Sequence, residues 1–138
     1  MSAERTIWIV DDSESDHALL RLAFKDSLDE VEFESFYSAE EAVESLKEGR
    51  SPSLVLLDLN MPGLGGLHFL QERQERSYLH VPVVILSSSS NPDDIKMTYG
   101  LGANSYLEKP GAFRDLKDFA SSVAAYWFKW AHLPSAVR

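Results

Sequence analysis

The sequence predicts a doubly wound α/β fold, in which helices cover both faces of a five-stranded parallel sheet. Short apolar segments alternate five times with segments of helical spacing, and acidic residues directly follow the first and third apolar segments. In such folds, right-handed crossovers bring the carboxyl ends of the strands to one edge, where the functional crevice lies. With 138 residues, 44% of them hydrophobic, the chain has the size of one domain, and we expect a single domain over residues 1–138.

The first half of the chain predicts three strands and two helices. The strands are short, apolar or alternating, and rich in β-branched residues, whereas the helices show apolar positions at helical spacing. Ser13 or Ser15 can cap the first helix, and Ser38 can cap the second. In chain order, strands and helices alternate over residues 6–10, 14–25, 31–36, 39–47 and 54–57.

The second half opens with a loop that contains Pro62 and three glycines, and then continues the alternation. Pro92 suits the first turn of a helix, and Gly102 can end the same helix. Helices and strands alternate over residues 67–76, 83–86, 92–101, 105–107 and 112–130. Pro134 follows the last helix, and the tail over residues 135–138 should fray.

Composition and charge exclude several classes of function. The chain has 22 acidic and 13 basic residues and a formal net charge of -9, so a phosphate backbone should repel it and nucleic acid is not an expected partner. No segment approaches the roughly 20 consecutive apolar residues of a membrane helix, and residues 1–5 lack the apolar core of a signal peptide. We therefore expect a cytoplasmic protein with no membrane partner. Because cysteine is absent, only oxygen and nitrogen ligands are available to a metal.

Three aspartates are predicted to meet at the carboxyl edge of the sheet. Asp11 and Asp12 follow the first strand, and Asp58 follows the third. Carboxylates this close repel one another, and a divalent cation would reverse the sign of the local field. Mg²⁺ prefers oxygen ligands, takes one or two carboxylates and keeps several waters. The aspartates therefore predict a partly hydrated Mg²⁺ site, although an isolated acidic pair can also be a solvated turn that favours the start of a helix.

A hydroxyl group and a cation follow the last two strands. Ser87 begins a run of four serines, and Lys109 follows the fifth strand. A carboxylate such as Asp58 can attack phosphorus while Mg²⁺ and Lys109 neutralise the phosphoryl oxygens and Ser87 binds one of them. Residues 88–90 can simply cap the next helix. The four histidines are scattered without ligand spacing, and we assign them no chemistry.

These residues resemble the response-regulator receiver family. The resemblance rests on Asp11-Asp12, on LLDLNMPGLGG over residues 56–66, on PVVILSS over residues 82–88 and on YLEKP over residues 106–110, and it spans nearly the whole chain. It implies a flavodoxin-like doubly wound (βα)5 fold with the strand order 2-1-3-4-5. It also implies a response regulator of a two-component or phosphorelay system, which is not an enzyme beyond its own phosphotransfer and autodephosphorylation.

The resemblance implies a role for each residue of the site. Asp58 corresponds to the phosphoacceptor and Lys109 to the lysine that binds the phosphate. Mg²⁺ is the implied cofactor, bound directly by Asp12 and Asp58, through a water by Asp11, and by the backbone carbonyl of Asn60.

Further positions relate to switching and to the lifetime of the phosphoryl group. Ser87 matches the switch hydroxyl, and Tyr106 matches an aromatic residue that rotates inward when that hydroxyl moves; by default Tyr106 would be a packing residue. Asn60 and Ser89 match positions that tune dephosphorylation, and their small polar side chains predict a modest lifetime. The Lys109–Pro110 bond is cis in the family, although the sequence alone leaves the isomer open.

The last helix carries more aromatic residues than one buried face can hold. Part of this aromatic surface should be exposed, and such patches mark partner contacts, so we expect a homodimer. The dimer would use the fourth helix, the fifth strand, the fifth helix and the extension over residues 126–138; the alternative is a helix that only wraps its own core. The inward stripe is predicted to consist of Phe113, Leu116, Phe119, Val123, Trp127 and Trp130. The predicted interface residues are Phe113, Tyr126, Trp127, Phe128 and Trp130.

The long last helix and the run Tyr126-Trp127-Phe128 are similar to small regulators paired with bacterial phytochrome histidine kinases. The resemblance therefore implies a sensor histidine kinase, with a bacteriophytochrome as one candidate, or a histidine phosphotransfer protein as the partner. No segment is left over for an output domain, so we expect a stand-alone receiver that signals by a conformational or dimerisation change.

Three other functions share parts of this pattern. A phosphatase of the haloacid-dehalogenase type also uses a strand-end aspartate and Mg²⁺, but it needs a second acid where this chain has Asn60. A phosphate-independent receiver-like scaffold would normally have lost the acidic pair, the acceptor or the lysine, and all of these are present. An FMN-binding flavodoxin would have a hydroxyl- and glycine-rich loop after the first strand, where this chain has acidic residues.

Overall fold

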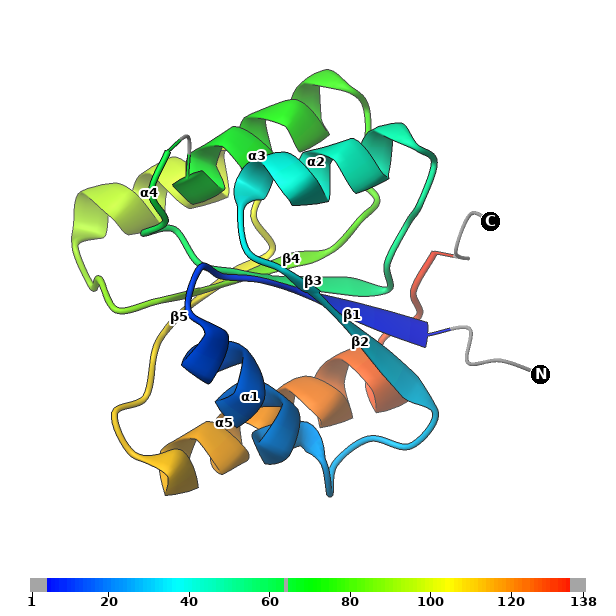
Figure 1. Ribbon diagram of the computed structural model, residues 1–138, viewed down its shortest axis with the longest axis vertical. Coiled ribbons are helices and arrows are strands. Elements are labelled where there is room, and N and C mark those ends of the chain that lie inside the picture. Colours follow the sequence, from blue (N-terminus) through cyan, green and yellow to red (C-terminus); the bar gives the residue numbers. More distant parts are fainter. Residues whose placement is uncertain (1–4, 64, 135–138) are drawn as a thin grey trace.

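The computed structural model describes residues 5–63 and 65–134, which form the predicted doubly wound α/β fold (Figure 1). Five strands pair in parallel in the order β2-β1-β3-β4-β5, so the predicted order is confirmed. The strands are β1 (Arg5–Val10), β2 (Val31–Phe36), β3 (Leu54–Leu57), β4 (Val83–Ser87) and β5 (Ser105–Glu108). The helices are α1 (Glu14–Phe24), α2 (Ala39–Lys47), α3 (Gly65–Glu75), α4 (Pro92–Gly100), α5 (Phe113–Ala125) and the π-helical turn η1 (Tyr126–Trp130).

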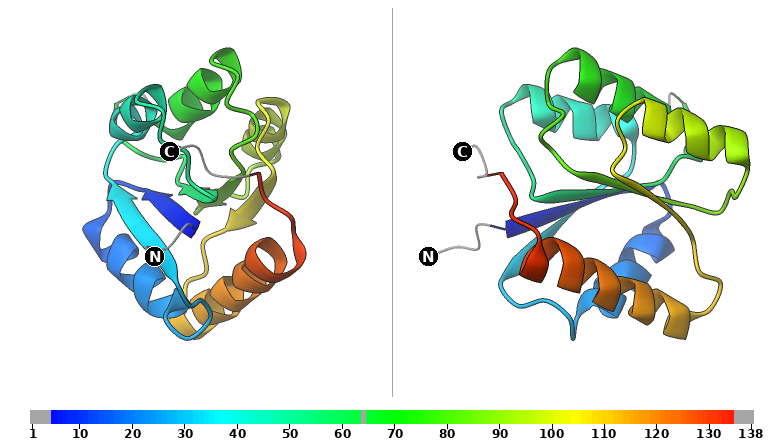
Figure 2. Two further views of the ribbon diagram at one scale, coloured as in Figure 1. Left: turned by 90° about the vertical axis from the view of Figure 1, so that its right-hand side faces the viewer. Right: turned by 180° about the vertical axis from the view of Figure 1, so that it is seen from behind.

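The sheet separates two hydrophobic cores. Successive side chains of a strand point to opposite faces, so Trp8 and Val10 of β1 belong to one core and Ile7 and Ile9 belong to the other. Helices α2 and α3 cover the first core with α4 beside them, and α1 and α5 cover the second (Figures 1 and 2). Because β3 and β4 are covered on both faces, all of their residues are buried, which explains their uninterrupted apolar sequences.

Local sequence signals fix the ends of several helices. Ser13 and Ser38 cap α1 and α2, and each side chain accepts a hydrogen bond from the backbone amide three residues further on. Pro92 lies in the first turn of α4, where a missing amide proton costs no hydrogen bond. Gly102 follows the end of α4 with φ at 95°, a conformation that glycine adopts without strain.

Helix α3 begins earlier than the sequence predicts. It starts at Gly65 rather than at residue 67, although glycine is a poor helix former. A Cβ atom on Gly66 would lie 2.5 Å from the carbonyl oxygen of Asp58 and 2.9 Å from the Cα of Leu59. The helix therefore packs closely against the loop that carries Asp58, and only glycine permits this approach.

The last helix changes pitch near its end. Helix α5 stops at Ala125, and the chain continues as η1, in which the amide of Ala131 donates to the carbonyl of Tyr126 over 2.8 Å. This bond spans five residues, as a π-helix requires, so side chains leave the angular spacing of an α-helix. None of the helices in the described ranges combines the length and the apolar character that a membrane span needs.

The predicted inward stripe of this helix is only partly correct. Leu116 and Val123 are buried, but Phe113 and Trp130 are 39% and 70% exposed, so their inward placement was wrong. Phe113 opens the first turn of α5, whose buried positions begin at Leu116. Trp130 follows the change of pitch, which removes it from the stripe. The tail expected to fray, residues 135–138, lies outside the described residues.

A buried arginine joins the segments that precede β4 and β5. Arg73 of α3 is 1% exposed, and its guanidinium donates to the carbonyls of Val81, Leu79 and Gly102 at 2.8 to 3.2 Å and to Asn104 Oδ1 at 3.3 Å. Burial lowers the pKa of Arg73 to about 10. Because these segments lead into the amino ends of the strands, Arg73 braces the edge of the sheet opposite the acidic residues.

Candidate functional site

Three aspartates meet at the carboxyl edge of the sheet. Strands β1 and β3 are neighbours with Val10 opposite Leu57, so the residues that follow, Asp11 and Asp58, lie at the same level. The Asp58 amide donates to the Val10 carbonyl over 2.9 Å and extends this pairing. Carboxylate oxygens of Asp11, Asp12 and Asp58 all lie within 4.8 Å of one another. Asp11 and Asp58 are buried, whereas Asp12 is exposed and opens the cluster to solvent.

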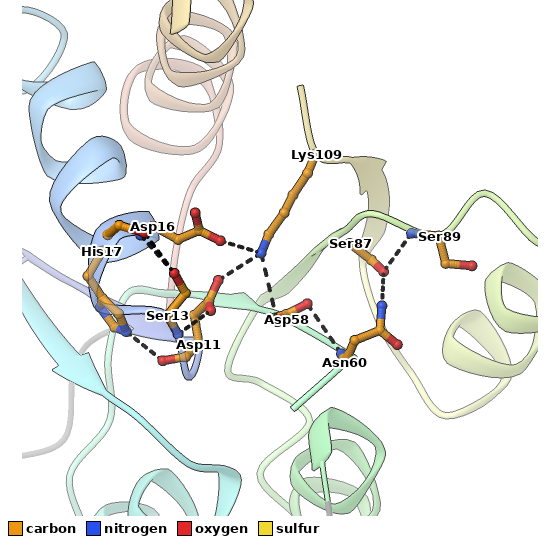
Figure 3. A network of polar contacts seen from close by, with 10 residues as sticks. Asp11, Ser13, Asp16, His17, Asp58, Asn60, Ser87, Ser89 and Lys109 are labelled. Carbon is orange, nitrogen blue, oxygen red and sulfur yellow. Dashed lines mark hydrogen bonds and ion pairs between the residues drawn. The ribbon is translucent and has the colours of Figure 1, made fainter. Parts of the chain in front are cut away.

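Lys109 reaches this cluster from the end of β5 (Figure 3). Its amide donates to the Ser87 carbonyl over 2.7 Å, which continues the pairing of β4 with β5 beyond the strands. The Nζ atom lies 2.7 Å from Asp16 Oδ2, 3.0 Å from Asp11 Oδ2 and 3.8 Å from Asp58 Oδ2. The predicted lysine is therefore in the site, but its hydrogen bonds go to Asp16 and Asp11 rather than to Asp58.

The peptide bond between Lys109 and Pro110 is trans, in contrast to the cis bond that the resemblance implies. For a bond before proline the trans isomer is favoured by about 0.5–1 kcal/mol. The lysine side chain points into the site with this isomer (Figure 3).

The electrostatics of the site favour a bound cation. Burial raises the pKa of Asp58 above its ordinary value; nearby Lys109 opposes this effect, and the neighbouring charge of Asp11 adds to it. Burial also disfavours the charged form of Lys109, but the hydrogen bonds that its ammonium donates to Asp16 and Asp11 outweigh this effect and raise its pKa. The charged Asp58 is thus held in an unfavourable environment that one lysine compensates only in part.

A chain of hydrogen bonds connects Asp58 with the predicted switch residue. The Asn60 amide donates to Asp58 Oδ1 over 3.2 Å, and Asn60 Nδ2 donates to Ser87 Oγ over 3.3 Å. Ser87 Oγ also accepts from the Ser89 amide over 3.1 Å, and Ser87 is fully buried. The structure therefore brings together Asn60, Ser87 and Ser89 as predicted neighbours of the acceptor, and their roles in switching and dephosphorylation stay predictions.

Tyr106 links the same network to the α4 side of the molecule. Its hydroxyl donates to the Ser89 carbonyl over 2.8 Å, and its ring packs against the core beneath α2 and α3. Its backbone amide donates to the Tyr99 hydroxyl of α4 over 3.2 Å. Ser89 Oγ donates to Asp94 in the first turn of α4. A displacement at Ser87 would therefore reach both β5 and α4 through Ser89.

Sequence reasoning missed two residues of α1. Asp16 pairs with Lys109, although nothing in the sequence distinguishes it from an ordinary acidic residue in the first turn of a helix. His17 is 2% exposed, its Nε2 lies 2.7 Å from the Asp11 carbonyl oxygen, and its ring lies 4.4 Å from that of Tyr37. Its buried Nδ1 has no hydrogen-bond partner among the described residues. The position of His17 on the buried face of α1 was the available signal.

The donor set fits a hard divalent cation. Three carboxylates converge, and no described nitrogen or sulfur ligand accompanies the acidic group, whereas the predicted contribution of the Asn60 carbonyl stays a prediction. Exposure of Asp12 leaves room for water ligands, which such ions retain. The residues of this chain are therefore suited to a partly hydrated cation beside Asp58.

The predicted dimer residues do not form one patch. Tyr126 and Trp127 line a groove of about 620 Å³ between β5 and α5, together with apolar residues such as Phe119. Phe128 lines a separate pocket with Arg5, whose guanidinium carbon lies 5.4 Å from the centre of the Phe128 ring. The groove is the larger apolar feature of the two.

A parallel sheet that carries three carboxylates and a lysine at its carboxyl edge defines a class of α/β domains suited to phosphoryl chemistry. The profile of the response regulator receiver domain matches residues 7–121. The chain belongs to the response regulator receiver family, and it is a receiver domain of two-component signalling.

Several relatives and solved structures are similar to the chain. The response regulator Rcp1 of Synechocystis is 31% identical over 139 residues, which cover 96% of this chain and 95% of Rcp1. The probable methanogenesis regulatory protein FilR2 of Methanothrix harundinacea is 40% identical over 88 residues, and the match covers 62% of this chain but only 57% of FilR2. The chain thus spans little more than half the length of that relative.

Two crystal structures share the fold over nearly the whole chain. Mn²⁺-bound Rcp1 has a TM-score of 0.85 at 30% identity, with coverage of 95% of this chain and 99% of that one. The phosphorylated cyanobacterial phytochrome response regulator RcpA has a TM-score of 0.89 at 31% identity, with coverage of 96% and 100%. These matches confirm the flavodoxin-like receiver fold and the likeness to phytochrome-associated regulators that the sequence predicts.

Proposed function

We propose that the protein accepts a phosphoryl group on Asp58 from a histidine kinase or a histidine phosphotransfer protein, in a reaction that requires Mg²⁺. The observation that carries this proposal is the position of the buried Asp58 carboxylate, within 4.8 Å of two further aspartates and 3.8 Å from Lys109. The Mn²⁺-bound Rcp1 and the phosphorylated RcpA support it as relatives.

In this reaction Asp58 is the nucleophile. One of its oxygens forms a bond to phosphorus while the bond from phosphorus to the donor breaks, and the donor leaves with that electron pair. Asp12, Asp58 and the Asn60 carbonyl would hold Mg²⁺ directly and Asp11 would hold it through a water, and the ion would neutralise the phosphoryl oxygens. The Lys109 ammonium supplies a second positive charge to these oxygens.

The signal leaves through Ser87 and Tyr106. The Ser87 hydroxyl turns to a phosphoryl oxygen and gives up its contacts with Asn60 and the Ser89 amide, which are 3.3 and 3.1 Å long. The Tyr106 hydroxyl is bound to the Ser89 carbonyl, so movement of this loop changes the α4 and β5 surface. Asn60 and Ser89, both small and polar, leave water access to the phosphoryl group and give it a modest lifetime.

We further infer a cytoplasmic protein that is no enzyme beyond its own phosphotransfer and autodephosphorylation. A bacteriophytochrome is the kinase that the likeness to Rcp1 and RcpA favours. A homodimer forms through α4, β5 and α5, because the groove lined by Tyr126 and Trp127 is largely apolar and Tyr126 is 60% exposed. Light scattering of the wild type and Tyr126→Ser, with and without phosphodonor, tests this assembly; a monomer throughout would contradict it.

The phosphorylation itself is tested with a small phosphodonor. Wild type and Asp58→Asn are incubated with acetyl phosphate, with Mg²⁺ or with EDTA, and measured by intact mass. We expect one phosphoryl adduct on the wild type, labile to base, and none on Asp58→Asn or without Mg²⁺. A folded wild type that gains no adduct would refute the proposal and favour a phosphate-independent scaffold.

A further inference from the structure

The geometry points to Asp16 as a positioning residue: its carboxylate holds the Lys109 ammonium on the α1 side of the site and competes for it with the phosphoryl group on Asp58. This inference rests on the proposed phosphorylation of Asp58 and concerns the equilibrium of that reaction. It assigns a role to an acidic residue outside the group of three aspartates suited to a cation.

The distances around Lys109 show where its charge is held. Nζ lies 2.7 Å from Asp16, a strong charge-assisted hydrogen bond, and 3.8 Å from Asp58, beyond hydrogen-bonding range (Figure 3). The Asp11 contact at 3.0 Å is intermediate. Asp16 is therefore the nearest partner of the lysine, and Lys109 is held closer to α1 than to the acceptor.

The backbone fixes Asp16 in this position. Ser13 caps α1 and accepts from the Asp16 amide over 3.2 Å, while its own amide donates to Asp11 Oδ1 over 2.9 Å. Asp16 is thus placed in the first turn of α1 by the same loop that places Asp11, and a carboxylate is stable at this end of a helix. Its side chain is 34% exposed.

A phosphoryl group on Asp58 would offer Lys109 new hydrogen-bond acceptors. The group adds negative charge and oxygen acceptors at Asp58, and Lys109 has to turn toward them and loosen its contact with Asp16. The Asp16 carboxylate also repels the added charge, since both face the same ammonium. Asp16 therefore favours the unphosphorylated state, and its neutralisation should favour the phosphorylated one.

The test compares Asp16→Asn with two matched variants. Glu14→Gln removes the same charge from the same turn of α1 at an exposed position, and Asp16→Glu keeps the carboxylate. Phosphorylation of each protein is measured against acetyl phosphate concentration at saturating Mg²⁺. For Asp16→Asn we expect the half-saturating donor concentration to fall about three- to tenfold, with no fall in the rate at saturation. Glu14→Gln should match the wild type, and Asp16→Glu should return toward it.

A second measurement does not depend on phosphorylation. The ¹⁵Nζ signal of Lys109 reports its ion pair by NMR and should shift in Asp16→Asn but not in Glu14→Gln. An unchanged Lys109 signal, or a donor requirement in Asp16→Asn equal to or above that of the wild type, would overturn the inference. A wild type that is not phosphorylated at all would instead refute the proposed function, so the two failures are distinguishable.

Discussion

Replacement of Asp58 by asparagine should stabilise the fold in the absence of a divalent cation. At an effective dielectric constant of about 20, a carboxylate at most 4.8 Å away repels Asp58 by at least about 3.5 kcal/mol, and Lys109 at 3.8 Å attracts it by about 4.4 kcal/mol. Asp11 and Asp12 both repel, so repulsion exceeds attraction by roughly 2–3 kcal/mol. Asp12 is exposed, and solvent weakens its field. We therefore expect Asp58→Asn to raise the free energy of unfolding by about 1–3 kcal/mol at neutral pH.

The gain should depend on pH in a defined direction. Burial raises the pKa of Asp58 in the folded protein above the unfolded value of 3.8. An acid of this kind contributes stability that is fully present below its unfolded pKa and is lost as the pH rises through the folded pKa. The charged Asp58 therefore weakens the wild type at neutral pH, and the advantage of the asparagine variant should vanish as the pH falls toward 3.8.

Urea unfolding in EDTA, followed by tryptophan fluorescence at several pH values, measures this difference. Asp118→Asn is the control, because it removes one negative charge from an exposed position of α5. We expect the control to match the wild type and Asp58→Asn to exceed both at neutral pH. A variant no more stable than the control, or a gain that persists unchanged in acid, would refute the electrostatic reasoning.

Three further predictions address the cation and the frame of the site. Mg²⁺ at a hundredfold excess over its dissociation constant should stabilise the wild type by about 2.7 kcal/mol, and Asp58→Asn by less; calorimetric melting temperatures independent of Mg²⁺ would contradict this. Arg73→Met should cost about 3–5 kcal/mol in urea unfolding, because four acceptors lose a buried charged donor, whereas the exposed Arg76→Met should stay close to the wild type. Gly66→Ala should lose roughly 1–3 kcal/mol of unfolding free energy and become phosphorylated more slowly. Gly111→Ala should show neither effect, because a Cβ atom at Gly111 has nothing within 4 Å. Equal stability of the two alanine variants would show that the loop before α3 can move to accommodate the methyl group.

The sequence alone was sufficient to predict the site residues that follow the ends of strands. Asp11, Asp58 and Lys109 each come directly after a strand, and parallel pairing alone carries such residues to one edge. Asp16 and His17 required the direction in which the first turn of α1 faces the sheet; the helical period places only His17, on the buried face of the helix. They contact Lys109 and the Asp11 carbonyl only because the turn after β1 is short and capped by Ser13.

The aromatic end of the chain was harder to predict for a different reason. A stripe argument assumes one helical pitch from Phe113 to Trp130, but the pitch changes at Tyr126 and the later side chains turn away. The trans bond after Lys109 likewise depends on the energy of a single dihedral angle, which no sequence pattern near it determines.

The two edges of the sheet divide stability and function between them. At the amino edge, Arg73 satisfies the carbonyls of the segments that lead into β4 and β5, and this edge is braced without any ligand. At the carboxyl edge, Asp11, Asp16 and Asp58 share one lysine, and that lysine lies closer to Asp16 than to Asp58. Repulsion among these carboxylates destabilises the fold when nothing is bound, and it makes the conformation of this edge sensitive to a bound ligand. In the proposed reaction, a cation and a phosphoryl group would each change the balance of charge around Lys109, and the bonds among Asn60, Ser87 and Ser89 would connect that change to the surface of α4 and β5.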